Sequence, residues 1–155
     1  MTTAAVAVCA TRTIKGEVLF TDSAKGVKVE ATFTQLPSGE HGFHIHRAGD
    51  LREKGCKGAC DHFHMGPPQP HGGPPTTSGP RHTGDLGNIS IGEDGTPFHK
   101  TYLLKGVQVS DLLGRSVIVH KDADDYGKGG FDDSLTTGHA GARLVCAIIG
   151  RAKGC

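Results

Sequence analysis

Residues 27–34 read Val-Lys-Val-Glu-Ala-Thr-Phe-Thr, a strict alternation of apolar and polar side chains. In a β-strand, successive side chains point to opposite faces, so this pattern buries one face and exposes the other. It predicts a strand over residues 27–36. The sequence Pro-Ser-Gly-Glu at 37–40 is typical of a turn and separates this strand from a second one over residues 41–46.

The other strands are predicted from short apolar or β-branched runs that turn residues separate. They cover residues 6–10, 17–21, 86–91, 98–104, 116–120 and 144–149. The 24 Gly and 8 Pro among 155 residues favour short strands and many turns over long helices. We therefore predict an all-β fold, a sandwich or flattened barrel of eight strands, as a single domain over residues 1–155.

Two long segments interrupt this pattern of strands. Residues 47–84 are rich in Gly, Pro and His, and residues 121–142 are rich in Gly and Asp. Loops of this length inside a small domain are usually either functional or disordered. Since most of the ten His lie in these loops or next to them, we interpret both loops as functional.

The overall charge argues against several classes of partner. The net charge is +1 with His neutral, so no strong field points to nucleic acid or to a membrane surface. No run of 18 apolar residues is present, which argues against a membrane-spanning helix. The apolar run at 4–10 lacks a preceding basic region and is more typical of a first strand than of a signal peptide. We predict a cytoplasmic protein, in which thiols usually stay reduced.

The first candidate metal ligands are His44 and His46 on the strand over residues 41–46. Residues two apart on a strand share a face, so both imidazoles can bind one metal. The pattern also occurs by chance, and this pair alone is weak evidence. A second set of candidates, His62, His71, His82 and Asp85, lies in or just after the first long loop.

Imidazoles and one carboxylate suit zinc and copper, although a disordered His-rich loop is the alternative interpretation. His120, which ends the strand over residues 116–120, brings the candidates to seven side chains. Seven side chains complete two four-coordinate sites only if one ligand is shared or if water contributes.

Several longer motifs resemble those of copper/zinc superoxide dismutases, in the same order and with similar spacing over nearly the whole chain. They are Gly-Phe-His-Ile-His at 42–46, His-Gly-Gly-Pro at 71–74, Arg-His-Thr-Gly-Asp-Leu-Gly-Asn at 81–88, Ala-Asp-Asp-Tyr-Gly-Lys-Gly-Gly at 123–130 and Thr-Gly-His-Ala-Gly-Ala-Arg-Leu at 137–144. The resemblance implies an eight-stranded flattened Greek-key β-barrel, an immunoglobulin-like sandwich with two long functional loops.

The resemblance also implies one copper and one zinc in each subunit. The implied copper ligands are His44, His46, His62 and His120, and the implied zinc ligands are His62, His71, His82 and Asp85. His62 is then shared through its two ring nitrogens, which resolves the count of seven side chains. Zinc is redox-inert and fits a closed, structural site, whereas copper can change its oxidation state.

The implied activity is that of an oxidoreductase, which converts superoxide to dioxygen and hydrogen peroxide as copper is alternately reduced and oxidised. The resemblance gives His62 the role of supplying a proton, and Arg143 that of attracting the superoxide anion. Thr137 would line the same channel. Asp124 would link a copper ligand, His44, to a zinc ligand, His71.

The resemblance further implies a disulfide between Cys56 and Cys146; two unpaired buried thiols are the alternative. Cys60 and Cys155 are extra to the family pattern. Two positions of the second loop also depart from it: Thr136 stands where a basic residue is common and Lys121 where an acidic one is common. These departures imply a different distribution of the positive charge that attracts the substrate, and the same reaction.

The family usually forms symmetric homodimers, which we also expect here. The implied contact segments are 48–49, 113–114 and 149–151, where Ala48 and Arg151 depart from the common pattern. Proline next to the guiding arginine tends to accompany dependence on a copper chaperone. Ala142 and Leu144 stand there, so we expect no strict requirement. A copper-chaperone-like or zinc-only binding protein on the same fold is the alternative, against which the complete ligand set argues.

Overall fold

A computed structural model describes residues 3–154 of the chain, and Cys155 lies outside them. Within this range the chain forms nine β-strands and two short helices. In chain order they are β1 (Ala4–Ala10), β2 (Lys15–Ser23), β3 (Gly26–Gln35), β4 (Gly39–His46), the 3-10 helix η1 (Lys54–Ala59), β5 (Asp85–Ile91), β6 (Phe98–Leu104), α1 (Val109–Leu112), β7 (Ser116–His120), β8 (Arg143–Ile148) and β9 (Gly150–Arg151). Neither helix is long and apolar enough to cross a membrane.

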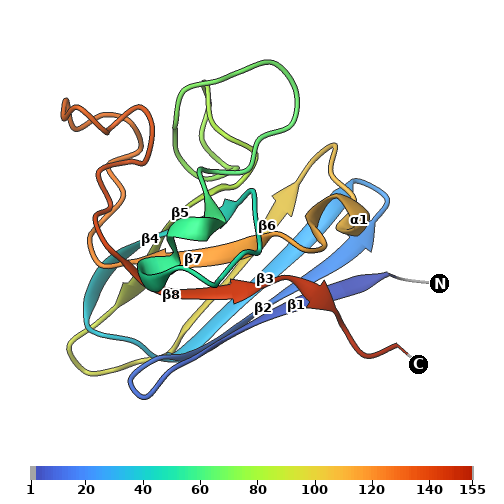
Figure 1. Cartoon of the computed structure of the whole chain (residues 1–155), viewed down its shortest axis with the longest axis horizontal. Helices are drawn as coiled ribbons and strands as arrows, with labels where there is room; N and C mark the ends of the chain where they lie inside the picture. The colour runs from blue at the N-terminus through green and yellow to red at the C-terminus, as the bar shows by residue number, and fades with distance from the viewer. Residues whose placement is uncertain (1–2, 155) are drawn as a thin grey trace.

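The strands form two antiparallel sheets that lie face to face (Figure 1). One sheet has the order β6-β3-β2-β1-β9 and the other has the order β5-β4-β7-β8. After β3, the chain crosses to the second sheet for β4 and β5 and returns to place β6 beside β3, a Greek-key connection. The predicted all-β fold is confirmed. It takes the form of a two-sheet sandwich, since the strand pairing found within residues 3–154 forms no closed barrel.

The hydrophobic core lies between the two sheets, as the alternation in β3 predicts. Val27, Val29, Ala31 and Phe33 are all fully buried. Phe33 meets Phe43 of β4 edge to face, with ring centroids 6.0 Å apart, so the two sheets are joined by an aromatic contact.

The last predicted strand, over residues 144–149, differs from the structure at its end. The backbone of Ile149 leaves the four-stranded sheet to bond with residues 114 and 115, and its side chain is fully buried. The next residues form β9, in which Gly150 and Arg151 pair with β1 of the other sheet. Burial of Ile149 therefore accompanies a change of sheet, which a single apolar run does not reveal.

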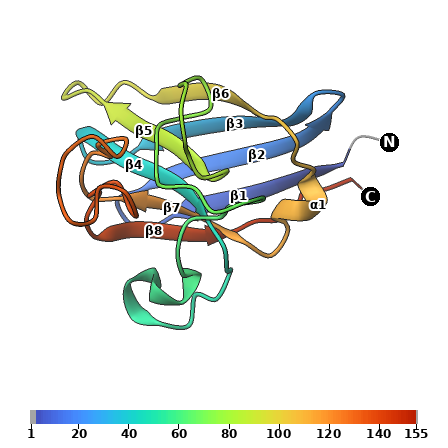
Figure 2. The ribbon, with the colours of Figure 1, turned by 90° about the horizontal axis from the view of Figure 1, so that it is seen from above.

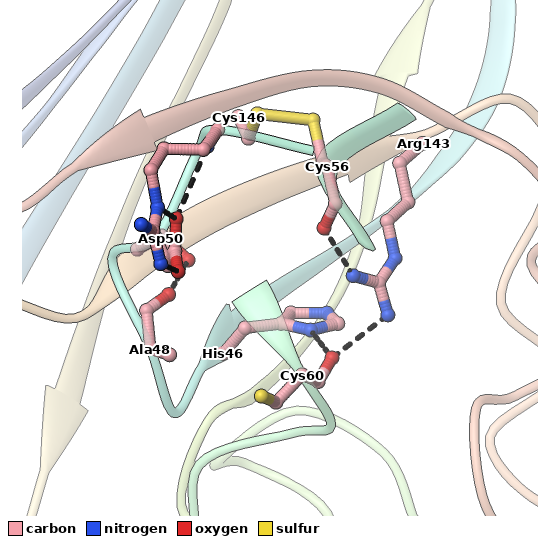
Figure 3. Close-up of a disulfide and its surroundings, with 9 residues drawn as sticks. His46, Ala48, Asp50, Cys56, Cys60, Arg143 and Cys146 are labelled. Carbon is pink, nitrogen blue, oxygen red and sulfur yellow. Dashed lines mark hydrogen bonds and ion pairs between the residues drawn. A yellow bond between two sulfur atoms is a disulfide. The ribbon is translucent and has the colours of Figure 1, made fainter. Parts of the chain in front are cut away.

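Both long loops lie over the outer face of the four-stranded sheet (Figures 1 and 2). In β4, Phe43 and Ile45 are core residues, whereas His44 and His46 point to this outer face and are buried beneath the loops. Cys56 and Cys146 form a disulfide that ties η1 of the first loop to β8 (Figure 3). The disulfide thereby holds the first loop against the sheet that carries the histidines.

Candidate metal centre

The first group of ligand-type side chains comprises His44, His46, His62 and His120. His44 and His46 come from β4 and His120 from the end of β7, while an isolated β-bridge between His46 and His62 holds the loop residue against the sheet. One ring nitrogen of each residue lies within 4.8 Å of those of the other three.

The same four side chains each carry a buried ring nitrogen that has no hydrogen-bond partner within residues 3–154. These atoms are His44 Nδ1, His46 Nε2, His62 Nε2 and His120 Nε2. A buried polar atom without a partner costs on the order of 1–3 kcal/mol, so four together are not expected in a purely structural cluster. A metal ion bound between these atoms would satisfy all four, and the group therefore fits a metal with imidazole ligands.

The opposite ring nitrogens have fixed partners. His46 Nδ1 donates to the carbonyl of Cys60 at 2.8 Å, and His120 Nδ1 donates to the carbonyl of Gly141 at 3.0 Å. Since carbonyl oxygens only accept, these nitrogens carry the proton and the orphaned ones carry the lone pair. Burial lowers the pKa of His44 and His46 well below the usual value and that of His120 to about 4, which favours the neutral ring that a metal needs.

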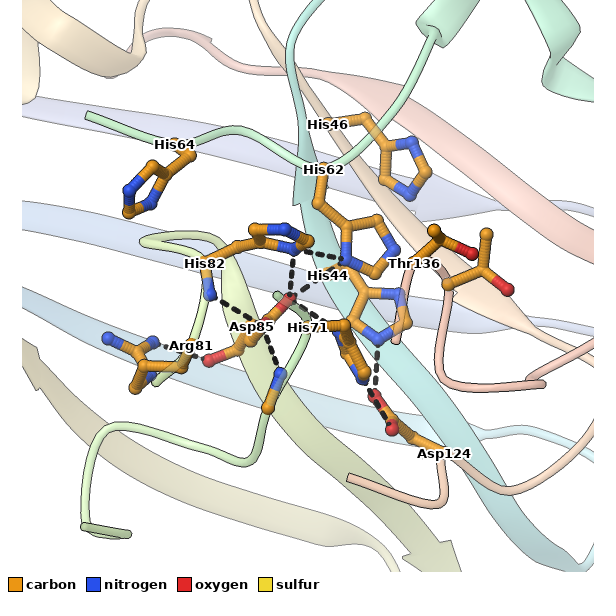
Figure 4. A network of polar contacts seen from close by, with 12 residues as sticks. His44, His46, His62, His64, His71, Arg81, His82, Asp85, Asp124 and Thr136 are labelled. Atoms are coloured by element: carbon orange, nitrogen blue, oxygen red, sulfur yellow. Dashed lines mark hydrogen bonds and ion pairs between the residues drawn. The ribbon is translucent and has the colours of Figure 1, made fainter. Parts of the chain in front are cut away.

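The second group is centred on Asp85 (Figure 4). Its Oδ1 atom lies 2.8 Å from His62 Nδ1, 2.9 Å from His71 Nδ1 and 3.4 Å from His82 Nδ1. Ligands about 2.0–2.1 Å from a tetrahedral zinc ion are about 3.3 Å apart, close to these separations. His71 Nδ1 lies near Asp85 without the alignment of a hydrogen bond, as expected for two ligands that face one ion.

The carboxylate of Asp85 is prepared for this role by its surroundings. Its other oxygen, Oδ2, accepts hydrogen bonds from the backbone N–H groups of Gly72 at 3.0 Å and His82 at 2.7 Å. Burial alone would raise the pKa of Asp85, but the histidines of the group lower it well below the usual range. Asp85 is therefore an ionised ligand with one oxygen directed at the three rings.

His62 belongs to both groups. Its Nδ1 faces Asp85 in the second group, while its Nε2 is one of the four orphaned nitrogens of the first. Asp124 forms a second link, because its two carboxylate oxygens accept from His44 Nε2 and from His71 Nε2. The two groups therefore form one connected centre.

Comparisons with known proteins agree with this geometry. The model of the family described as "Copper/zinc superoxide dismutase (SODC)" matches residues 14–149. The chain belongs to the copper/zinc superoxide dismutase family.

Three relatives in this family are Cu-Zn superoxide dismutases. That of Paramecium bursaria Chlorella virus 1 is 43% identical over 90% of this chain and 74% of its own length. That of Brassica juncea is 41% identical over 88% of this chain and 90% of its own length. That of Candida albicans is 47% identical over 74% of this chain and 73% of its own length. Among solved structures, the crystal structure of the clock protein EA4 aligns with a TM-score of 0.82 at 37% identity, over 96% of this chain and 94% of its own. The family uses copper and zinc. Two sets of side chains lie close enough to hold a metal ion: His44, His46, His62 and His120, and His44, His62, His71 and Asp85. His82, the remaining zinc ligand expected from the sequence, lies 3.4 Å from Asp85.

Arg143 lies beside the first group of this dismutase-family centre (Figure 3). Its guanidinium donates to the carbonyl of Cys56 at 2.6 Å and to that of Cys60 at 2.8 Å. Cys60 thus accepts from both Arg143 and His46. Burial lowers the pKa of His46 and His120, and the positive charge of Arg143 lowers both further. Arg143 is therefore close enough to affect these two rings electrostatically. Thr137 bonds through its hydroxyl to the backbone oxygen of Asp133 at 3.3 Å within the second loop.

Some residues that shape the centre have no clear signal in the sequence. Gly138 has φ +75°, and a Cβ built there would lie 2.3 Å from Asp124 Oδ1 and 2.5 Å from His71 Nε2. Only glycine leaves room for the hydrogen bond between those two side chains. Gly138 is part of the motif at 137–144, but nothing in the motif itself indicates this close approach. The carbonyls of Cys60 and Gly141 likewise act through the backbone, which any residue type carries.

Proposed function

We propose that the chain acts as a superoxide dismutase at this centre, with one copper held by His44, His46, His62 and His120. One zinc would be held by His62, His71, His82 and Asp85, so that His62 would be a ligand in both sets. The proposal rests on four buried ring nitrogens that have no hydrogen-bond partner in the described part of the chain. One of them belongs to His62, whose other ring nitrogen faces Asp85.

The reaction consumes two superoxide anions and two protons and yields one dioxygen and one hydrogen peroxide. Copper supplies the alternate gain and loss of one electron that this reaction requires. The protein orients the imidazoles through Asp124, Cys60 and Gly141. Whenever its lone pair is free, His62 Nε2 would take up a proton from water and pass it to the reduced product, while the second proton would come from water directly. Arg143 would attract and orient the anion.

The proposal is tested by a crystal structure with anomalous scattering at the copper and zinc edges, together with a superoxide-decay assay on the same metal-loaded protein. We expect two metals on either side of His62 and rapid decay of superoxide. Metals too far apart to share one imidazole would contradict the bridge. Metal binding without superoxide decay would instead favour a copper-chaperone-like or zinc-only binding protein.

Replacing Arg143 with Ala is expected to slow dismutation on the order of tenfold at low ionic strength, because a positive charge beside the site steers an anion towards it. The salt dependence of the rate should also become flatter, since salt screens this attraction. Both metals should stay bound, because Cys60 still accepts from His46. Arg12→Ala, an exposed charge change on the turn between β1 and β2, is the matched control. An unchanged rate at low salt would refute the role of Arg143.

We propose a homodimer that uses the exposed apolar side chains of Val8 on β1 and Ile148 on β8, which are 61% and 49% exposed. The two side chains lie near each other, because β8 leads directly into β9 and β9 pairs with β1. This corrects one expectation from the sequence: the side chain of Ile149 lies in the core of its own chain and is not available to a partner. Ile148 takes its place in the proposed contact.

Sedimentation equilibrium tests this interface. The native protein should sediment with about twice the chain mass of 16.2 kDa. The double change Val8→Glu and Ile148→Glu should give monomers, because it places buried charges on both sides of a symmetric contact. Leu135→Glu, at an equally exposed position of the second loop, should leave the dimer intact. A native protein that sediments as a single chain would rule the dimer out.

We also propose that the chain is a single cytoplasmic domain over residues 1–155 that protects against superoxide and loads copper without strict need for a chaperone. Ala142 and Leu144 on either side of Arg143 support the last point. Expression in cells that lack the copper chaperone should yield active protein with the Cys56–Cys146 disulfide. Inactive protein without this disulfide would count against independent loading.

A further inference from the structure

His82 differs from the other proposed zinc ligands in how it is held. Its side chain is 16% exposed, whereas those of His62, His71 and Asp85 are at most 1% exposed. Within residues 3–154 its ring contacts polar atoms only of His62 and Asp85, which are themselves members of the group. The His71 ring has a partner outside the ligand set, Asp124, and His62 is held to the sheet by the β-bridge between His46 and His62. The position of the His82 ring must therefore depend on its backbone.

The backbone next to His82 is bound by the side chain of His64. His64 Nδ1 accepts a hydrogen bond from the backbone N–H of Thr83 at 3.1 Å and lies 3.3 Å from the Thr83 hydroxyl. On the other side of the ring, His64 Nε2 donates to the carbonyl of Pro67 at 2.8 Å. The Thr83 hydroxyl in turn accepts from the N–H of Met65 at 3.0 Å. His64 thus joins the segment that carries His62 to the one that carries His82.

The direction of these bonds defines the role of each ring nitrogen. A peptide N–H only donates and a carbonyl only accepts, so His64 Nδ1 carries the lone pair and Nε2 carries the proton. The lone pair that could bind a metal is therefore directed to Thr83. The rings of His64 and His82 lie with their centroids 5.8 Å apart (Figure 4). His64 stands next to the site without being available as a ligand.

We propose that His64 is a positioning residue for His82 and sets the zinc affinity of this chain, an inference that rests on the proposed zinc site. The bond from Thr83 to His64 Nδ1 joins the bonds from the His82 N–H to Asp85 and from Arg81 to the Thr83 carbonyl in fixing the backbone of residues 82–83. The His82 ring therefore reaches Asp85 and His62 although no other polar group within residues 3–154 holds it. Outer partners of metal ligands typically contribute 10–100-fold to metal affinity. His64 would contribute to zinc affinity indirectly, because it holds the backbone of Thr83, the residue that follows His82.

The test compares zinc affinities of the copper-loaded, disulfide-bonded protein, measured by competition with a chromophoric chelator. His64→Ala is expected to weaken zinc binding by about tenfold. Asn carries an acceptor at the position of Nδ1, whereas Gln carries its polar group nearer to Nε2. His64→Asn should therefore keep the affinity within about threefold of the native value, and His64→Gln should behave like His64→Ala. His99→Ala, an exposed histidine on β6, is the control and should bind zinc as the native protein does.

Cobalt in place of zinc gives a second readout, because its visible absorption reports the geometry of its ligands. We expect a changed spectrum for His64→Ala and a native one for His64→Asn. Native zinc affinity in His64→Ala, or equal losses in the Asn and Gln variants, would overturn the inference. If His64→Ala does not fold, the difference in zinc affinity between His64→Asn and His64→Gln tests the inference.

Asp85→Asn separates failure of this inference from failure of the proposed zinc site. Loss of zinc in Asp85→Asn together with native affinity in His64→Ala would overturn the role of His64 alone. Native zinc affinity in Asp85→Asn would overturn the site itself and the inference with it.

Discussion

Replacing Cys56 and Cys146 together with Ser is expected to lower the free energy of unfolding of the metal-free protein by about 4–5 kcal/mol. The two residues are separated by 90 positions, and their bond removes much of the conformational freedom of the unfolded chain. This loss is a large share of the roughly 5–15 kcal/mol that stabilises a typical domain. Equilibrium unfolding in urea, followed by circular dichroism, measures the change.

The control is Cys60→Ser, which alters an exposed thiol of the same loop that forms no disulfide with any cysteine of residues 3–154. The change keeps the backbone carbonyl of residue 60. It should change the free energy of unfolding by no more than about 0.5 kcal/mol. A loss of less than about 1 kcal/mol in the double variant would contradict the assigned role of the disulfide. The double variant should also loosen Arg143, because the carbonyl of Cys56 is one of its two acceptors.

Replacing Asp124 with Asn is expected to weaken zinc binding 10–100-fold and to disturb the copper site as well. Each carboxylate oxygen accepts from one ring, His44 Nε2 or His71 Nε2, and the side chain is fully buried. An amide presents one oxygen and one NH2 group, so one of the two ring N–H groups would face another donor. The buried, unsatisfied group would turn its ring away from the metal.

Competition titrations with zinc and with copper measure both affinities in this variant. Asp132→Asn makes the same charge change at an exposed position of the same loop, and its metal affinities should match those of the native protein. A folded Asp124→Asn protein that binds both metals normally would show that the link between His44 and His71 is dispensable. The same result would leave the ligand assignments themselves unchanged.

Most of the fold could be predicted from local patterns in the sequence. The alternation at 27–34 predicts β3 and its buried face, because a strand has the same period of two wherever it lies. The change of sheet at Ile149 could not be predicted in this way. It depends on bonds between residue 149 and residues 114 and 115, which are distant in the sequence. The helix α1 could not be predicted either, because four residues are too few to show a helical period.

The proposed ligands could be named from the sequence, because metal chemistry restricts them to few residue types and the motifs place them in order. Seven side chains for two four-coordinate sites left either a shared ligand or a water ligand open, and the family resemblance pointed to sharing of His62. Which nitrogen of His62 faces which group was decided only by the tertiary structure. The same is true of the room that Gly138 leaves beside Asp124 and of the carbonyl of Cys60 that joins His46 to Arg143.

The division has a physical reason. Side-chain chemistry and strand period are properties of single residues and near neighbours, and they are therefore written in the sequence itself. Ring orientation, close approach and backbone acceptors arise when loops 47–84 and 121–142 fold onto one face of a sheet. These contacts join residues as far apart as His44 and Asp124, and they exist only once the sandwich has formed.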